Sequence, residues 1–270
     1  MSTTTPAAHR LTLTAAEFSH LVDRLDVDLP PDWRPAPDIG AGSEAALLDK
    51  GVLQGSGDLV KVHPSIEANV RIIAGPQIMF DTTATCGSKG SRSLHVISGA
   101  LGASLFLLPE AGVELSMFSS VDLGRELVRA VPEPDATGIG STLDSAEAPE
   151  PLRGTVPLAA LHELGVADLL READPDAPGY VLAELHLPKA EAEFALAVVK
   201  RTDGVLRCLV TALIGAGVRT AQLTWLHSDT GWVGIQPAAT GAGRKLVELE
   251  PVDRADLGVW VAPYVSEALT

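Results

Sequence analysis

The sequence has few cysteines, few aromatic residues and few positive charges. Its 270 residues include 2 cysteines and 4% aromatic residues, and 20 lysines and arginines stand against 35 aspartates and glutamates. Cys86 and Cys208 lie in different halves with no second cysteine nearby, so neither a disulfide framework nor a cysteine-based zinc site is expected. The net charge of −15 repels phosphate backbones, which argues against nucleic-acid binding.

Long hydrophobic runs are missing as well. The apolar segments are short and interrupted, so none is expected to cross a bilayer as a helix. The N-terminus, MSTTTPAAHRLTLTAAEF, has no basic stretch followed by an apolar run, so no secretory signal is predicted. With 46% hydrophobic residues the composition is that of a globular protein. We expect one soluble, cytoplasmic domain spanning residues 1–270, without membrane insertion.

The two halves of the chain share landmarks in the same order. Residues 46–54 read ALLDKGVLQ and residues 160–168 read ALHELGVAD, so both follow the pattern Ala-Leu-x-x-x-Gly-Val. Glycine reaches the left-handed conformation at little cost, and Gly51 and Gly165 are therefore predicted to end a helix in each half. The chain resembles a tandem duplication.

Each half continues with a second predicted helix, which Pro64 and Pro188 are suited to begin. Runs rich in β-branched and apolar residues follow, separated by glycine-rich turns, and they predict an antiparallel meander of four strands. The runs are IMFDTTATC, SRSLHVIS, ASLFLL and VELSMF, and then VLRCLVTALI, RTAQLTWLH, WVGIQPA and RKLVELE. A closing helix in each half carries Asp-Leu-Gly, at 122–124 and 256–258. We expect these two glycines to be closely packed.

The sequence therefore predicts an α+β fold with two quasi-symmetric halves that share a central sheet. Each half is helix–helix–four-stranded antiparallel meander–helix, with the N-terminal half at 46–131 and the C-terminal half at 160–266. Residues 132–151 are rich in proline, acidic and small residues, so they are predicted to be a linker. Before the first half, LTLTAAEFSHLVDRL predicts a short amphipathic helix.

Signals for catalysis are isolated. Residues 229–231 form Asp-Thr-Gly, the triplet with which aspartic proteases present a carboxylate, but the matching residues 100–102 are Ala-Leu-Gly. That chemistry needs two carboxylates sharing one proton, so a turn is the favoured interpretation. A hydrolase that uses Asp229 in a homodimer is kept as an alternative. Zinc-binding histidine spacing and nucleotide-binding glycine spacing are both lacking, and neither a cofactor, a metal nor an enzymatic activity is expected.

Four segments carry a resemblance to a known family. They are LTLTAAEFSHLVDRLDVDLPPDW, SEAALLDKGVL, SLHVISGALGASLFLLPEAGVELSMFSSVDLGRELVRAVPE and GWVGIQPAATGAGRKLVELEPVDRADLGVWVAPYVSEAL. The chain resembles the EspG family, the cytosolic chaperones of actinobacterial type VII (ESX) secretion. The resemblance implies an EspG-like fold with a helical subdomain and no cofactor. It also implies a PE–PPE heterodimer, or a similar helical-hairpin secretion substrate, as the cargo whose apolar tip is covered and kept soluble.

The candidate residues for contact with such cargo are Lys89, Arg92, Trp225, His227 and Trp232. Trp225 and His227 alternate onto one face of a predicted strand, and tryptophan is favoured at interaction hot spots. Lys89 and Arg92 lie in the hairpin between the first two strands, where they would orient an acidic partner. Ordinary packing and solvation explain each of the five equally well. The alternative function is a non-enzymatic scaffold or regulatory module without PE–PPE cargo, and a homodimer is considered for either.

Overall fold

The computed structural model describes residues 10–34, 43–134, 149–238 and 244–269. The first half of the chain contains β1 (Arg10–Thr14), α1 (Ala15–Leu25), α2 (Ser43–Asp49), β2 (Leu53–Gln54), η1 (Gly57–Leu59), β3 (Lys61–Val62), α3 (Pro64–Ala74), β4 (Ile78–Cys86), β5 (Lys89–Ser98), β6 (Leu101–Leu108), β7 (Gly112–Ser119), η2 (Ser120–Asp122) and α4 (Leu123–Val128). The second half contains β8 (Gly154–Pro157), α5 (Leu158–Leu169), α6 (Ala177–Leu185), α7 (Lys189–Arg201), β9 (Thr202–Ile214), β10 (Gly217–Ser228), β11 (Gly231–Pro237), β12 (Leu246–Pro251) and α8 (Asp256–Leu269).

Ten of these strands form a single antiparallel sheet in the order β1-β7-β6-β5-β4-β9-β10-β11-β12-β8. Both predicted meanders are present, and they join where β4 pairs with β9, from Ile78 opposite Ala212 to Cys86 opposite Gly204. The edge strands β1 and β8 were not predicted. The strand order is symmetric about the β4–β9 pair, so the prediction of an α+β fold whose halves share a central sheet is confirmed.

One predicted helix end is wrong. Gly165 lies inside α5, which continues past it, whereas Gly51 follows α2 with a φ of 70° as expected. The helix that follows edge strand β8 is α5, and the helix that follows edge strand β1 is α1 rather than α2. Repeat units at 46–131 and 160–266 stay a prediction, and the strand order favours units that begin at β1 and β8. The middle of the predicted linker 132–151 lies outside the described residues.

The predicted N-terminal helix is α1, and its first turn is fixed by a reciprocal cap. The Glu17 backbone N–H donates to Thr14 Oγ1 at 3.2 Å, and the Thr14 N–H donates to Glu17 Oε2 at 2.7 Å. Such a capping box satisfies two N–H groups that the helix itself leaves unpaired. Burial acts to raise the pKa of Glu17, but the Lys50 ammonium and the Thr14 bonds outweigh it and hold the pKa below its ordinary value.

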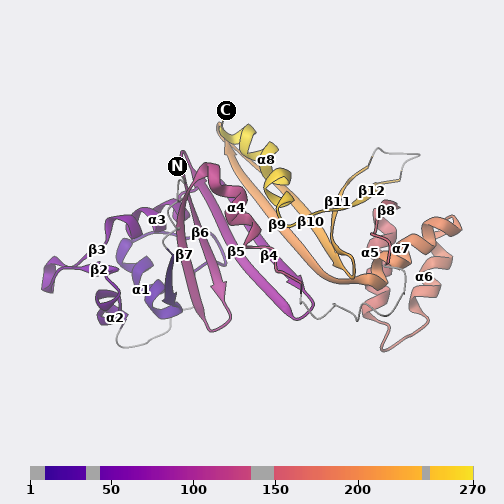
Figure 1. Cartoon of the computed structure of the whole chain (residues 1–270), viewed down its shortest axis with the longest axis horizontal. Coiled ribbons are helices and arrows are strands. Elements are labelled where there is room, and N and C mark those ends of the chain that lie inside the picture. Colours follow the sequence, from indigo (N-terminus) through magenta and orange to yellow (C-terminus); the bar gives the residue numbers. More distant parts are fainter. Residues whose placement is uncertain (1–9, 35–42, 135–148, 239–243, 270) are drawn as a thin grey trace, which may run out of the picture.

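Helices cover the two faces of the sheet unequally (Figure 1). On one face, α4 and α8 pack over the centre around Phe80 and Trp225. On the other face, one helical layer with Phe18 of α1 covers β5, β6 and β7. A second layer with Leu164 of α5 covers β8, β11 and β12. Figure 1 shows the N-terminal helices at one end of the sheet and α5, α6 and α7 at the other. The central strands thus have one helix-covered face and one face between the two layers.

His95 lies buried beneath α4, and it makes the stability of the fold sensitive to acid. Desolvation lowers the pKa of His95 to about 3, and the Arg129 guanidinium acts in the same direction. The Glu126 carbonyl opposes them, although it forms no hydrogen bond of normal geometry with the ring. The ordinary pKa of histidine is near 6.5. Below that pH the ring therefore binds a proton in the unfolded chain but stays neutral in the folded chain.

Stability should consequently fall as the pH is lowered from about 6.5 towards 3, by about 1.4 kcal/mol per pH unit from this group. The variant His95→Leu keeps an apolar group beside Phe106 and cannot titrate. Between pH 7 and 4.5 the wild type should lose about 2–3 kcal/mol more unfolding free energy than the variant. Urea unfolding at both pH values measures this difference. Parallel losses in the two proteins would show that His95 is not buried as a neutral ring.

Candidate protein-binding face

The face of β4, β9 and β10 that lies between the two helical layers is open to solvent. Cross-strand rows run over it, with Arg207 opposite both Thr83 and Thr224, and with Leu213 opposite Val218. We call this surface the central open face. Its residues are Thr83, Thr85, Arg207, Leu209, Thr211, Leu213, Val218, Thr220, Gln222 and Thr224, all exposed or half-buried.

Large apolar side chains stand in water on this surface. Leu209, Leu213 and Val218 are 42%, 50% and 65% exposed, while threonine and glutamine fill most of the remaining positions. An antiparallel sheet commonly has one solvated face, but that face is then mainly polar. Exposed apolar side chains with a polar surround mark protein-interaction surfaces.

This surface was not predicted, although the strands carry a signal for it in their sequence. In β9, buried Leu206 and Cys208 alternate with exposed Arg207 and Leu209. The β10 run RTAQLTWLH places threonine and glutamine at every second position in the same way. This period of two shows that one face of these strands is solvated.

Arg92 lies at the N-terminal border of the central open face. It pairs with Thr83 across β4 and β5, and its guanidinium lies 4.9 Å from the centroid of the Trp33 ring. Trp33 is itself fully buried and donates its indole N–H to Asp81 Oδ2 at 3.0 Å. The hydrogen bond holds the Trp33 ring in place, and the cation–π contact holds the Arg92 guanidinium over that ring. The role of Arg92 in binding a partner stays a prediction.

Lys89 lies on the other side of the sheet. The turn between β4 and β5 has only two residues, so Lys89 and Arg92 both belong to β5. They are three residues apart in a strand, which places their side chains on opposite faces. Lys89 Nζ donates to the Glu133 carbonyl at 2.9 Å. The prediction that these two residues form one basic loop is therefore wrong.

The structure brings Trp225, His227 and Trp232 together, as predicted, but in the core. The His227 and Trp232 rings lie 5.0 Å apart and the Trp225 and Trp232 rings 6.4 Å apart. All three are buried, because α8 covers this face and places Trp260 5.7 Å from Trp225. His227 Nδ1 is 2.5 Å from Asp203 Oδ1. The prediction that these residues line an exposed binding surface is thus corrected.

The Asp-Thr-Gly triplet is a turn. Asp229 and Thr230 connect β10 to β11, and Gly231 has a φ of 105°. The Asp229 carboxylate pairs with Arg201 at 2.7 Å. Burial raises the pKa of the Cys208 thiol to about 12, which keeps it protonated. No cluster of metal-ligating side chains occurs in the described ranges.

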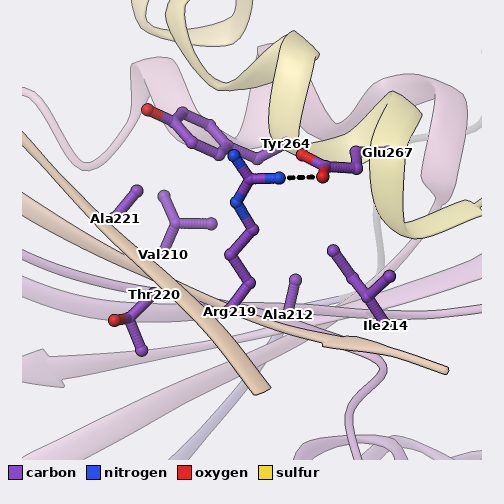
Figure 2. A pocket seen from close by; sticks show the side chains of 8 residues that line it. All are labelled: Val210, Ala212, Ile214, Arg219, Thr220, Ala221, Tyr264 and Glu267. Atoms are coloured by element: carbon purple, nitrogen blue, oxygen red, sulfur yellow. Dashed lines mark hydrogen bonds and ion pairs between the residues drawn. The ribbon is translucent and has the colours of Figure 1, made fainter. Parts of the chain in front are cut away.

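A small hollow lies between α8 and the ends of β9 and β10 (Figure 2). The space that it encloses is far smaller than the roughly 300–1,000 Å³ of typical ligand pockets. Figure 2 shows Arg219 reaching across it to pair with Glu267, beside Tyr264. Its lining is otherwise aliphatic apart from Thr220. The hollow thus has the size and lining of a packing gap closed by an ion pair.

None of the helices in the described part of the chain has the length and apolar character that a membrane span needs. Models of protein families do not match the sequence, and a search of curated proteins also gives no match. Among solved structures, the chain is similar to one in the structure of the Mycobacterium tuberculosis type VII secretion system chaperone EspG5 in complex with the PE25-PPE41 dimer. The TM-score is 0.64 at 12% identity, over 96% of each chain. The two chains share a fold along nearly their whole length, so the EspG-like fold expected from the sequence is confirmed.

Proposed function

We propose that this chain is a non-enzymatic, cytoplasmic chaperone of type VII (ESX) secretion that holds a PE–PPE-type helical heterodimer. The observation that carries the proposal is the central open face, which presents Leu209, Leu213 and Val218 between two helical layers. The EspG-like fold supports it, because the EspG5 structure contains a PE25-PPE41 dimer. Covering an apolar helical tip on this face stabilises the complex by ~25 cal/mol per Å² and removes an aggregation site. No cofactor takes part in this role.

Charge placed on the central open face should abolish cargo binding without unfolding the protein. Leu209→Asp and Leu213→Asp are each expected to weaken binding of a PE–PPE pair by at least ~100-fold, since a carboxylate would be desolvated against an apolar tip. The cargo is the PE–PPE pair encoded nearest to this chain's own gene, co-expressed and purified. Calorimetry measures the affinity, and a thermal melt checks the fold.

The matched control is Leu101→Asp. Leu101 is a strand leucine of similar exposure, 45%, but it lies at the β5–β6 turn outside the central open face. This variant should bind as the wild type does. Equal binding by all three variants would contradict the assigned face. Failure of the wild type to bind any neighbouring PE–PPE pair would contradict the chaperone function.

The second candidate is a scaffold or regulatory module of the same fold without PE–PPE cargo. The same exposed leucines favour it, because an apolar face identifies a protein partner without naming it. Genomic neighbours that encode PE, PPE or WXG-type helical hairpins favour the chaperone, and their absence favours the scaffold. The hydrolase alternative predicts that Asp229→Asn changes the phenotype, whereas a turn residue paired with Arg201 predicts no change beyond a small loss of stability. A homodimer stays a prediction.

A further inference from the structure

Helix α5 is apolar on its exposed side as well as on its buried side. Ala160, Leu164 and Ala167 are buried in the C-terminal core. The exposed residues of the helix are Leu158, Ala159, His162, Glu163, Val166 and Leu169, and of these only Glu163 carries a formal charge at neutral pH. A helix on a protein surface normally turns charged residues to water. This one has the composition of a helix covered on both sides.

Three exposed apolar residues and one histidine lie along one line of the helix. Leu158, His162, Val166 and Leu169 follow the spacing i, i+4, i+8, i+11, and we call them the α5 stripe. Such spacing keeps side chains on one face over about 17 Å of helix length. Leu158, Val166 and Leu169 are 44%, 47% and 84% exposed. The length and the chemistry of the stripe suit the apolar side of one amphipathic helix laid against it.

The segment that carries the α5 stripe is acidic, whereas Lys245 stands at the N-terminal end of the stripe, where the Leu158 N–H donates to the Lys245 carbonyl at 2.9 Å. Residues 158–186 contain six aspartates and glutamates and one arginine. That arginine, Arg171, pairs with Asp168, and no ion pair of the other five acids is found among the described residues. A second copy of this chain would bring the same acids together, and an anionic lipid surface would be repelled likewise. A partner with lysines and arginines beside its apolar side would be attracted.

We propose that the α5 stripe is a docking surface for a cationic amphipathic helix of a partner protein. It lies on a different element from the central open face, so this binding does not depend on the proposed cargo. A chaperone with two such surfaces would hold one protein on its sheet while a basic helix of another engages α5.

The probe is a synthetic amphipathic helix of about 18 residues, or ~27 Å, with leucines on one side and lysines beside them. Fluorescence anisotropy against the full chain should give saturable binding that weakens as salt screens the charges. The same peptide with glutamates in place of the lysines should bind at least about tenfold more weakly. Equal binding of the two peptides would overturn the proposed partner chemistry.

The variant Val166→Lys places a like charge in the middle of the stripe, and it should raise the dissociation constant of the lysine peptide at least about tenfold. Val259→Lys makes the same change at a valine of α8 that is 69% exposed, and it should change the constant less than about twofold. Equal losses would mean diffuse attraction to an acidic protein and would overturn the site. A dimer seen in sedimentation of the wild type and lost in Val166→Lys would assign the stripe to a second copy instead.

Discussion

Replacing Trp225 with alanine is expected to lower the free energy of unfolding by about 3–5 kcal/mol. The side chain is fully buried in the core between the sheet and α8. It contacts Trp260 edge-to-face at a centroid distance of 5.7 Å, and the centroid of the Trp232 ring lies 6.4 Å away. Removal of the ring leaves a cavity that this closely packed region cannot fill. Urea unfolding at pH 7 measures the loss directly.

The matched control is Trp225→Phe. The indole Nε1 of Trp225 has no hydrogen-bond partner among the described residues, so phenylalanine keeps an aromatic ring and removes an unsatisfied donor. It should cost less than half of what alanine costs, because less volume is lost and no hydrogen bond is broken. A Trp225→Ala variant that unfolds like the wild type but loses its cargo would instead show that this residue contacts a partner.

The strands were predictable because their signals are local. Runs of β-branched and apolar residues separated by glycine-rich turns marked β4 to β7 and β9 to β12, and two consecutive meanders then favoured one antiparallel sheet. The edge strands β1 and β8 were missed for a physical reason. They have 5 and 4 residues, and β8 contains both Gly154 and Pro157. Such segments become strands because β7 and β12 offer them a partner.

The candidate site was harder to predict because it depends on where the helices pack. Alternation predicts that Trp225 and His227 share one face of β10, and the favoured role of tryptophan at interfaces predicts that this face binds the partner. The structure reverses this choice, because α8 lies over Trp225 and leaves Gln222 in solvent. No local signal identifies which face of a strand a distant helix will cover. A similar limit applies to Lys89 and Arg92. The turn before them has only two residues, so both lie in β5 and their side chains point to opposite faces of the sheet.

The repeated Asp-Leu-Gly triplets meet in space, and they place a strong constraint on the fold. Gly124 of α4 and Gly258 of α8 lie against each other where the two helices cross. A Cβ added at residue 258 would come within 2.9 Å of the Gly124 Cα, whereas a Cβ added at residue 124 would lie 3.8 Å from the Gly258 Cα. The first distance is too short for two carbon atoms and the second is an ordinary contact. The close packing expected of both glycines is present, but only residue 258 excludes a side chain.

Gly258→Val should therefore destabilise the protein by about 2–3 kcal/mol, because backbone rather than a flexible side chain must move. Movement of α4 would also strain the bonds that join the helices. Arg254, just before α8, donates to the Val131 carbonyl at 2.8 Å and to the Val128 carbonyl at 3.1 Å. Gly124→Ala should cost less than about 1 kcal/mol, since the higher helix propensity of alanine offsets a small adjustment.

Gly165→Ala is the matched control for a helical glycine without neighbours. A Cβ at this position in α5 would meet nothing within 4 Å, so the substitution should stabilise the protein by up to about 1 kcal/mol. Urea unfolding of the three variants should then rank Gly165→Ala above Gly124→Ala and Gly124→Ala above Gly258→Val. A Gly258→Val protein as stable as the wild type would mean that α4 and α8 do not cross at these glycines.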